Sequence, residues 1–229
     1  MNYKIVSDKN KLISFIDWLP ELEDNEKYYL SLFARKKYCQ ELIKSNDKTQ
    51  LKRFTSDKDR MLKKILQLEV PLGRWYLRDT LAPQQSLVLY INPNPRSMKK
   101  ATQMMGKKCW DLMFNKNYNL HAEAMSCIQR SKSRGIFVDF DIDEKNIDLD
   151  LDYLDAIVGT GNYDVLDTRG GYHILVKPDL ATKFREENGM NKNWYNDIKK
   201  TYPVDQTGDN MIPVAGCVQG GYIPKFISK

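Results

Sequence analysis

The sequence predicts an α+β fold, and three observations lead to it. The chain has 229 residues, of which 41% are hydrophobic and 29% are charged, as is typical of globular proteins. Apolar residues recur at helical spacing in some segments, and in others they form the short runs or alternating patterns of β-strands. Both kinds of segment are mixed along the chain with no internal repeat, so neither an all-α nor an all-β class fits.

The first eighty residues are predicted to be mostly helical. Ser7 or Asp8 can cap a first helix, which ends at Pro20. A second helix is expected over residues 26–44 and a third over residues 56–69, each from the spacing of its apolar side chains. Helices therefore account for most of this region.

The middle of the chain alternates between predicted strands and helices. An apolar run at residues 86–91 precedes Asn-Pro-Asn-Pro-Arg, which favours a strand that ends in a rigid turn. Helices are expected over residues 97–115 and 121–130, and a strand over residues 136–143. A further helix is expected over residues 149–158, before two nearby glycines.

The last third of the chain contains shorter elements. Two strands joined by a Gly-Gly turn are expected within residues 163–178. A polar segment that is compatible with a helix follows, to about residue 200, and residues 203–227 are expected to form loops and short strands. The mixture completes the α+β pattern.

Composition excludes several classes of protein. The apolar runs are too short to cross a membrane, and the N-terminus lacks the apolar core and cleavage site of a signal peptide. The four cysteines, separated by 70, 18 and 90 residues, form no CxxC pair, which disfavours a disulfide framework and a zinc ribbon. We therefore expect a cytoplasmic protein with reduced cysteines and no membrane partner.

Charge is unevenly distributed along the chain. Residues 1–130 contain 24 Lys and Arg against 14 Asp and Glu, whereas residues 131–229 contain 12 against 16. This asymmetry predicts a polyanion partner for the first part and a carboxylate-rich site in the second. Any single basic cluster can also be an ordinary solvated helix face. Two clusters are expected to contact the polyanion: Arg35, Lys36 and Lys37 form the first, and Arg96, Lys99 and Lys100 form the second.

The segment Ile-Phe-Val-Asp-Phe-Asp-Ile-Asp is the most informative stretch. Side chains alternate between the two faces of a strand, so Asp139, Asp141 and Asp143 are expected on one face, with Phe140 and Ile142 on the other. Neighbouring carboxylates repel one another unless a cation lies between them, and hard oxygen ligands favour Mg²⁺ or Mn²⁺. The alternative is a strand that ends in a solvated acidic loop.

Two further segments contain candidate site residues. Thr168, Arg169 and a Gly-Gly pair precede His173 on a predicted strand, and a guanidinium and an imidazole at such a turn suit phosphate oxygens. Near the C-terminus, Asp205 follows Val204, and Asp209 lies in Gly-Asp-Asn, where an aspartate is readily explained as a turn former. Asp205 is the stronger candidate for a third metal ligand. Each segment alone is also compatible with an ordinary turn.

The order of these segments resembles the archaeo-eukaryotic primase superfamily, in particular small stand-alone primase-polymerases of phages and plasmids. That family has three hydrophobic residues before Asp-x-Asp/Glu, then small-x-His, then hydrophobic-Asp. The matching residues here are Ile136-Phe137-Val138-Asp139-Phe140-Asp141, Gly171-Tyr172-His173 and Val204-Asp205. Thr168 matches the small hydroxyl residue that often lies five positions before the histidine. Of the family's Arg-x-Pro-Gly-Thr-like segment only the glycine remains, within residues 213–217.

The resemblance implies an RRM-like catalytic sheet with an N-terminal α/β module. Residues 81–229 would form the primase-polymerase catalytic core. Residues 1–80 would be a basic helical region that binds DNA or packs on the core, and the two would form one compact unit.

The resemblance also implies an activity: DNA-templated nucleotidyl transfer with two Mg²⁺ or Mn²⁺ ions. Asp139, Asp141 and Asp205 would hold the metals. His173 would bind the phosphates of the incoming nucleotide, and the nucleotide-binding residues near it would be Thr168, Arg169 and Gly171. The implied partners are a single-stranded DNA template, nucleoside triphosphates and a replicative helicase, in phage or plasmid replication within a bacterial host cell.

Two other functions compete with this one. A non-catalytic DNA-binding replication protein could keep the primase fold, although it would have little reason to keep three facing acids. A nuclease or rolling-circle initiator would need paired histidines and a catalytic tyrosine, whereas His173 is the only histidine in its predicted strand.

Overall fold

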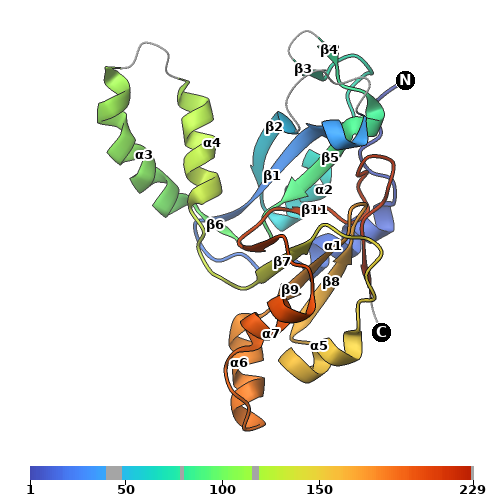
Figure 1. Ribbon diagram of the computed structural model, residues 1–229. Helices are drawn as coiled ribbons and strands as arrows, with labels where there is room; N and C mark the ends of the chain where they lie inside the picture. Colours follow the sequence, from blue (N-terminus) through green and yellow to red (C-terminus); the bar gives the residue numbers. More distant parts are fainter. Residues whose placement is uncertain (40–47, 78–79, 115–118, 228–229) are drawn as a thin grey trace.

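The computed structural model describes residues 1–39, 48–77, 80–114 and 119–227 (Figure 1). Within these ranges the chain forms seven α-helices, two antiparallel sheets of five strands each and a small two-stranded sheet. The predicted α+β class is confirmed. No helix in the described part of the chain is long and apolar enough to cross a membrane.

The first sheet has the strand order β11-β5-β1-β2, and β6 pairs with the start of β1. All of its pairings are antiparallel. The five strands are β1 (Glu26–Arg35), β2 (Lys48–Ser56), β5 (Leu87–Ile91), β6 (Arg96–Ser97) and β11 (Ile212–Pro213). Segments from both ends of the chain therefore build this sheet.

Strand β1 overturns the prediction of a helix over residues 26–44. It lies between β2 and β5, and eight of its ten residues are buried. A strand buried on both faces has a nearly continuous apolar run without alternation, and such a run cannot be distinguished from a helix by periodicity. Tyrosine and phenylalanine, which favour strands, supply much of that run. Residues 40–44 of the prediction lie outside the described residues.

The second sheet has the order β10-β7-β9-β8-β12 and is also entirely antiparallel. Its strands are β7 (Val138–Ile142), β8 (Tyr163–Asp167), β9 (Tyr172–Val176), β10 (Gln206–Gly208) and β12 (Lys225–Ile227). Both predicted strands of the 163–178 hairpin and the predicted strand at 136–143 are present. Strand β9 is the central strand, and β7 lies between β9 and β10, so both strands are paired along two edges.

Three helices cover one face of the second sheet: α5 (Leu151–Val158), α6 (Pro178–Glu187) and α7 (Trp194–Thr201). They enclose a core that includes Phe140 of β7 and Ile174 of β9, which are paired across the two strands. These helices do not cover the opposite face of β7 and β9, and the candidate site lies on that face.

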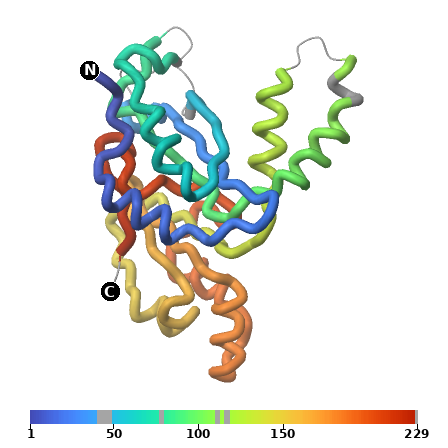
Figure 2. Tube along the Cα trace, turned by 180° about the vertical axis from the view of Figure 1, so that it is seen from behind, coloured from blue at the N-terminus to red at the C-terminus, as the bar shows by residue number. Residues whose placement is uncertain are grey.

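The two sheets share a hydrophobic core, which α1 (Lys9–Trp18) and α2 (Lys58–Leu66) help to enclose. This core joins Leu30 of β1 with Leu166 and Leu175 of the second sheet. The predicted first and third helices are thus confirmed as α1 and α2. The C-terminal strand β12 lies against α1 (Figure 2), where the rings of Phe226 and Trp18 are 4.7 Å apart.

Helices α3 (Met98–Met113) and α4 (Leu120–Arg130) form a hairpin that projects from the body of the molecule (Figures 1 and 2). Both were predicted. At the base of this α3–α4 hairpin, the Ser97 N–H donates to the Ser131 carbonyl at 2.8 Å. The remaining short elements are β3 (Tyr76–Leu77), β4 (Thr80–Leu81) and the 3-10 helices η1 (Lys36–Tyr38) and η2 (Gln84–Ser86).

Candidate functional site

A cavity of about 800 Å³ lies against the face of β7 and β9 that the helices α5–α7 leave uncovered. Asp141, Asp143, His173 and Asp205 line it from the second sheet and its loops. The first sheet and the α3–α4 hairpin supply other walls. Residues from most of the chain's length therefore meet around one space.

Strand register sets the positions of the carboxylates on β7. Asp141 is directly opposite His173 on β9, and Asp139 is opposite Leu175, which places both aspartates on the uncovered face. Phe140 pairs with Ile174 and points into the other core. The predicted sharing of one face by Asp139 and Asp141 agrees with this register. Asp143 follows the end of the strand and also lines the cavity.

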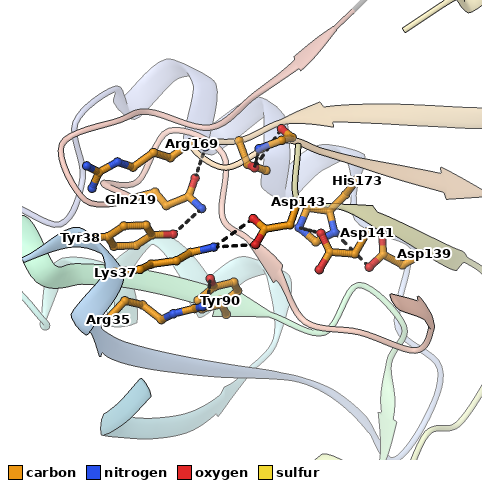
Figure 3. A network of polar contacts seen from close by, with 12 residues as sticks. Arg35, Lys37, Tyr38, Tyr90, Asp139, Asp141, Asp143, Arg169, His173 and Gln219 are labelled. Carbon is orange, nitrogen blue, oxygen red and sulfur yellow. Dashed lines mark hydrogen bonds and ion pairs between the residues drawn. The ribbon is translucent and has the colours of Figure 1, made fainter. Parts of the chain in front are cut away.

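His173 lies between the two β7 carboxylates (Figure 3). Its Nδ1 is 3.0 Å from both carboxylate oxygens of Asp139, and its Nε2 is 3.6 Å from Oδ1 of Asp141. Burial alone would lower the pKa of His173, but the surrounding aspartates outweigh it and the pKa is raised. The imidazolium form is thus favoured, and Asp139, at 1% exposure, is held by it.

Asp141 experiences the excess negative charge of the site. Its pKa is raised by burial first and then by the charges of Asp139, Asp143 and Asp205, against the opposing effect of His173. Even with His173 protonated, His173 and Lys37 supply only two positive charges beside these four carboxylates. A cation that entered the cavity here would be stabilised by this excess charge.

Asp205 and Asp209 have different environments, although both line the cavity. The Asp205 N–H donates to the Asp141 carbonyl at 2.8 Å, and its carboxylate is exposed. Asp209 accepts hydrogen bonds from Asn94 at 2.9 Å and from Arg96 at 2.5 Å. The explanation of Asp209 as a simple turn former was therefore wrong, because its carboxylate is fixed by tertiary partners.

The turn between β8 and β9 is built by Thr168 and Gly171. The Thr168 hydroxyl donates to the Gly171 carbonyl at 3.0 Å, and the Gly171 N–H lies 3.2 Å from the same hydroxyl. A Cβ at Gly171 would lie 1.8 Å from the carbonyl oxygen of Ile142, so only glycine fits. Gly171 thus packs on the end of β7, whereas Thr168 and Gly170 line the cavity.

Arg169 points along a neighbouring wall (Figure 3). Its guanidinium lies 4.6 Å from the ring centre of Tyr38 and donates to the Gly220 carbonyl at 2.7 Å. Gln219 links the same parts, since it accepts from the Arg169 N–H and donates to the Tyr38 hydroxyl. This network joins the β8–β9 turn to η1 of the first sheet.

The basic residues at 35–37 do not form one cluster, because Arg35 and Lys37 contact different partners. Lys37 Nζ lies 3.0 Å and 3.3 Å from the two carboxylate oxygens of Asp143, and it lines the cavity. Arg35 donates to the Tyr90 hydroxyl at 2.9 Å and lines the cavity too. No local pattern pointed to Tyr90 or Gln219 as site residues, because they reach the cavity only through long-range folding.

The residues of the second basic cluster, Arg96, Lys99 and Lys100, also differ in their environments. Arg96 is 1% exposed and paired with Asp209, so it is not on the open surface where a DNA contact was expected. Lys100 donates to the backbone carbonyls of Lys132 and Ser133 at 3.1 Å and 3.4 Å. Lys99 is exposed on α3.

The described residues supply possible metal ligands, but not a complete metal site. Within the described part of the chain, no three His, Cys, Asp or Glu side chains are arranged to hold a metal ion. The available donor atoms are nevertheless carboxylate oxygens, which hard cations such as Mg²⁺ prefer, because Asp141, Asp143 and Asp205 line the same cavity. The backbone hydrogen bond between Asp205 and Asp141 keeps two of them adjacent, so side-chain rotation could bring them together.

The site thus combines clustered carboxylates, a buried histidine and basic side chains around one cavity. Comparisons of the chain with protein-family models, with curated proteins and with solved structures find no match. Its function is therefore inferred from its own residues and their geometry.

Proposed function

We propose that this protein is a DNA-templated nucleotidyltransferase, a primase or primase-polymerase. The observation that carries the proposal is the cavity that Asp141, Asp143 and Asp205 line beside the His173–Asp139 pair. Phosphoryl transfer chiefly needs positioning and neutralisation of charge, and this arrangement can supply both. The antiparallel second sheet, with helices on one face and the acids on the other, supports the RRM-like catalytic sheet that the sequence resemblance implies.

Asp141 and Asp205 are the residues best placed to hold Mg²⁺ or Mn²⁺, with Asp139 behind them. Two such ions would activate the attacking 3′-hydroxyl and stabilise the leaving pyrophosphate. The protein's own contribution is to hold one carboxylate on β7 and the other directly before β10, where a backbone hydrogen bond joins the two residues. Release of Asp139 from His173 would add the third ligand that the family pattern implies.

The incoming nucleoside triphosphate is proposed to lie at the β8–β9 turn. His173 and Thr168 line the cavity there, and the favoured imidazolium form of His173 suits phosphate oxygens. Lys37 brings a further positive charge to the same place. Arg169 would act from the adjacent wall, where it holds Tyr38.

Single-stranded DNA is the proposed template, and exposed basic residues of the first part would contact its phosphates. Replication of a phage or plasmid in the cytoplasm of a bacterial cell, with a helicase partner, is the setting that the resemblance implies. The alternative is a non-catalytic DNA-binding replication protein with this fold. The absence of a ready three-ligand metal group among the described residues is the observation that favours it.

Primer synthesis without a primer tests the proposal. The protein is incubated with single-stranded DNA, Mn²⁺ or Mg²⁺ and labelled nucleotides. Products of several nucleotides, absent when the metal is chelated, are expected. DNA binding without any product would favour the non-catalytic alternative.

A further inference from the structure

Arg96 lies in an unusual setting at one end of the cavity. The side chain is 1% exposed, and Nη1 donates to Asp209 at 2.5 Å. Its Nε and Nη2 are also buried, yet no described residue accepts a hydrogen bond from either. Buried donors are nearly always satisfied, because an unpaired one loses its hydration without compensation. The guanidinium of Arg96 therefore has two N–H groups that could donate hydrogen bonds to a bound anion.

Other polar groups at this end of the cavity have unused capacity. Asn210 Nδ2 and Asn92 Oδ1 are buried without a partner among the described residues, and both side chains line the cavity. A half-turn of the Asn92 amide would present its NH₂ group instead. Arg130, an exposed residue of α4, lines the same cavity. Arg96 and Arg130 thus both line the cavity, where Asp209 is the carboxylate paired with Arg96.

The strand register separates this end from the other positive groups. Asp209 follows Gly208, which is paired with Asp139 at the start of β7. Lys37 instead contacts Asp143, beyond the end of β7. At a rise of about 3.4 Å per residue, the two ends are roughly 17 Å apart. The aspartates of β7 therefore lie between two basic ends of one cavity.

We propose that Arg96, Asn210 and Arg130 form a second phosphate subsite. Planar guanidinium groups bind phosphate oxygens in pairs, and the amide adds a neutral donor. In nucleotidyl transfer the attacking and leaving oxygens lie on opposite sides of the reacting phosphorus. If the triphosphate lies towards Lys37, the strand with the attacking hydroxyl enters at the Arg96 end. Naming that strand rests on the proposed function, whereas phosphate binding does not.

Phosphate could reach this subsite from two sources. One is a phosphodiester of a growing strand, and the other is the free phosphate of the first nucleotide. Calorimetric titration in metal-free buffer with a dinucleoside monophosphate and with a nucleoside 5′-monophosphate separates them. If variants of the subsite lose affinity for the dinucleoside monophosphate, the subsite binds the growing strand. If they lose affinity for the nucleoside 5′-monophosphate, it binds the first nucleotide.

Two variants remove the subsite in different ways. Arg130→Gln removes an exposed charge and leaves the core intact. Arg96→Met combined with Asp209→Asn removes the buried charge and its partly exposed partner together, which avoids leaving one of them unpaired. The matched control is Lys183→Gln, which removes an exposed charge from α6. Each subsite variant should weaken binding of at least one probe by about tenfold, and the control should not.

Wild-type affinity for both probes in Arg130→Gln would overturn the proposal, as would the absence of binding by the wild-type protein. Arg130→Gln decides the question even where the double variant fails to fold. A wild-type protein that binds the probes through these residues but makes no primer would keep the subsite and reject the polymerase function.

Discussion

At the residue scale, the site is governed by the position of His173 between two carboxylates of β7. Asp139 has both oxygens 3.0 Å from His173 Nδ1, whereas Asp141 is 3.6 Å from Nε2. Asp139 is therefore hydrogen-bonded to His173, whereas Asp141 lies beyond hydrogen-bonding distance from it. Substitutions that look equivalent in the sequence should consequently have different effects on stability.

Asp141→Asn should abolish nucleotide joining without lowering the melting temperature in metal-free buffer. Burial and neighbouring carboxylates raise the pKa of Asp141 in the folded state, so its charge destabilises the fold at neutral pH. Any stability gained should shrink as the pH falls through the raised folded-state pKa, and it should be absent below about pH 4, where the carboxyl is protonated in folded and unfolded chains. Differential scanning fluorimetry across pH, with and without Mg²⁺, measures this.

Asp139→Asn is the informative counterpart. It removes the charge that holds a buried imidazolium, and we expect the free energy of unfolding to fall by about 1–3 kcal/mol. Equal melting temperatures for the two variants would contradict the pairing. Nucleotide joining by Asp141→Asn would reject its role in catalysis.

Asp205→Asn and Asp209→Asn should separate catalysis from stability. Asp205 is exposed and close to Asp141, so its substitution should stop synthesis at saturating Mn²⁺ with an unchanged melting temperature. Asp209 pairs with buried Arg96, so its substitution should cost about 1–3 kcal/mol of stability. The sequence alone predicted no such cost. Primer assays and urea unfolding of both variants test this, and a stable but inactive Asp209→Asn would reverse the assignment.

At the element scale, β1 and η1 connect the first sheet to the site. Strand β1 ends at Arg35, and the next turn brings Lys37 to Asp143 and Tyr38 to Arg169. The residues expected from their sequence to form one DNA-binding cluster thus face different partners. The α3–α4 hairpin is the other element that exposes basic side chains beside the cavity.

If the triphosphate lies at the β8–β9 turn as proposed, Lys37→Gln should raise the KM for nucleotides by about three- to tenfold, because it would remove a charge-assisted hydrogen bond to the phosphates. Lys36→Gln, one residue earlier on η1, is the comparison, and it should leave the nucleotide KM unchanged. Steady-state primer extension at varied nucleotide concentration gives both values. Equal KM values for the two variants would place Lys37 outside the nucleotide site.

Replacement of Lys99 and Lys107 by glutamine should weaken binding of single-stranded DNA. Both lysines are exposed on α3. The slope of log affinity against log salt should fall by about 0.7 for each DNA phosphate that a lysine no longer neutralises. Fluorescence anisotropy at several salt concentrations measures the slope, with Lys183→Gln on α6 as the control. An unchanged slope would make this face of the hairpin an ordinary solvated surface.

At the scale of the whole molecule, local patterns predicted more of the second sheet than of the first. The alternation around Asp139 and the Gly-Gly turn before His173 depend on neighbouring residues, and both were recognisable. Strand β1 was missed because it is buried on both faces. The pairing of Arg96 with Asp209 joins residues 113 positions apart, which no local pattern encodes.

Template-directed incorporation tests the central claim most directly. Homopolymeric single-stranded DNA templates are each incubated with Mn²⁺ and one labelled nucleotide at a time, without primer, using wild-type protein and Asp141→Asn. We predict products only when the nucleotide is complementary to the template, and none from the variant. Products that form regardless of the template, equal products from Asp141→Asn, or DNA binding with no product at all would contradict the claim.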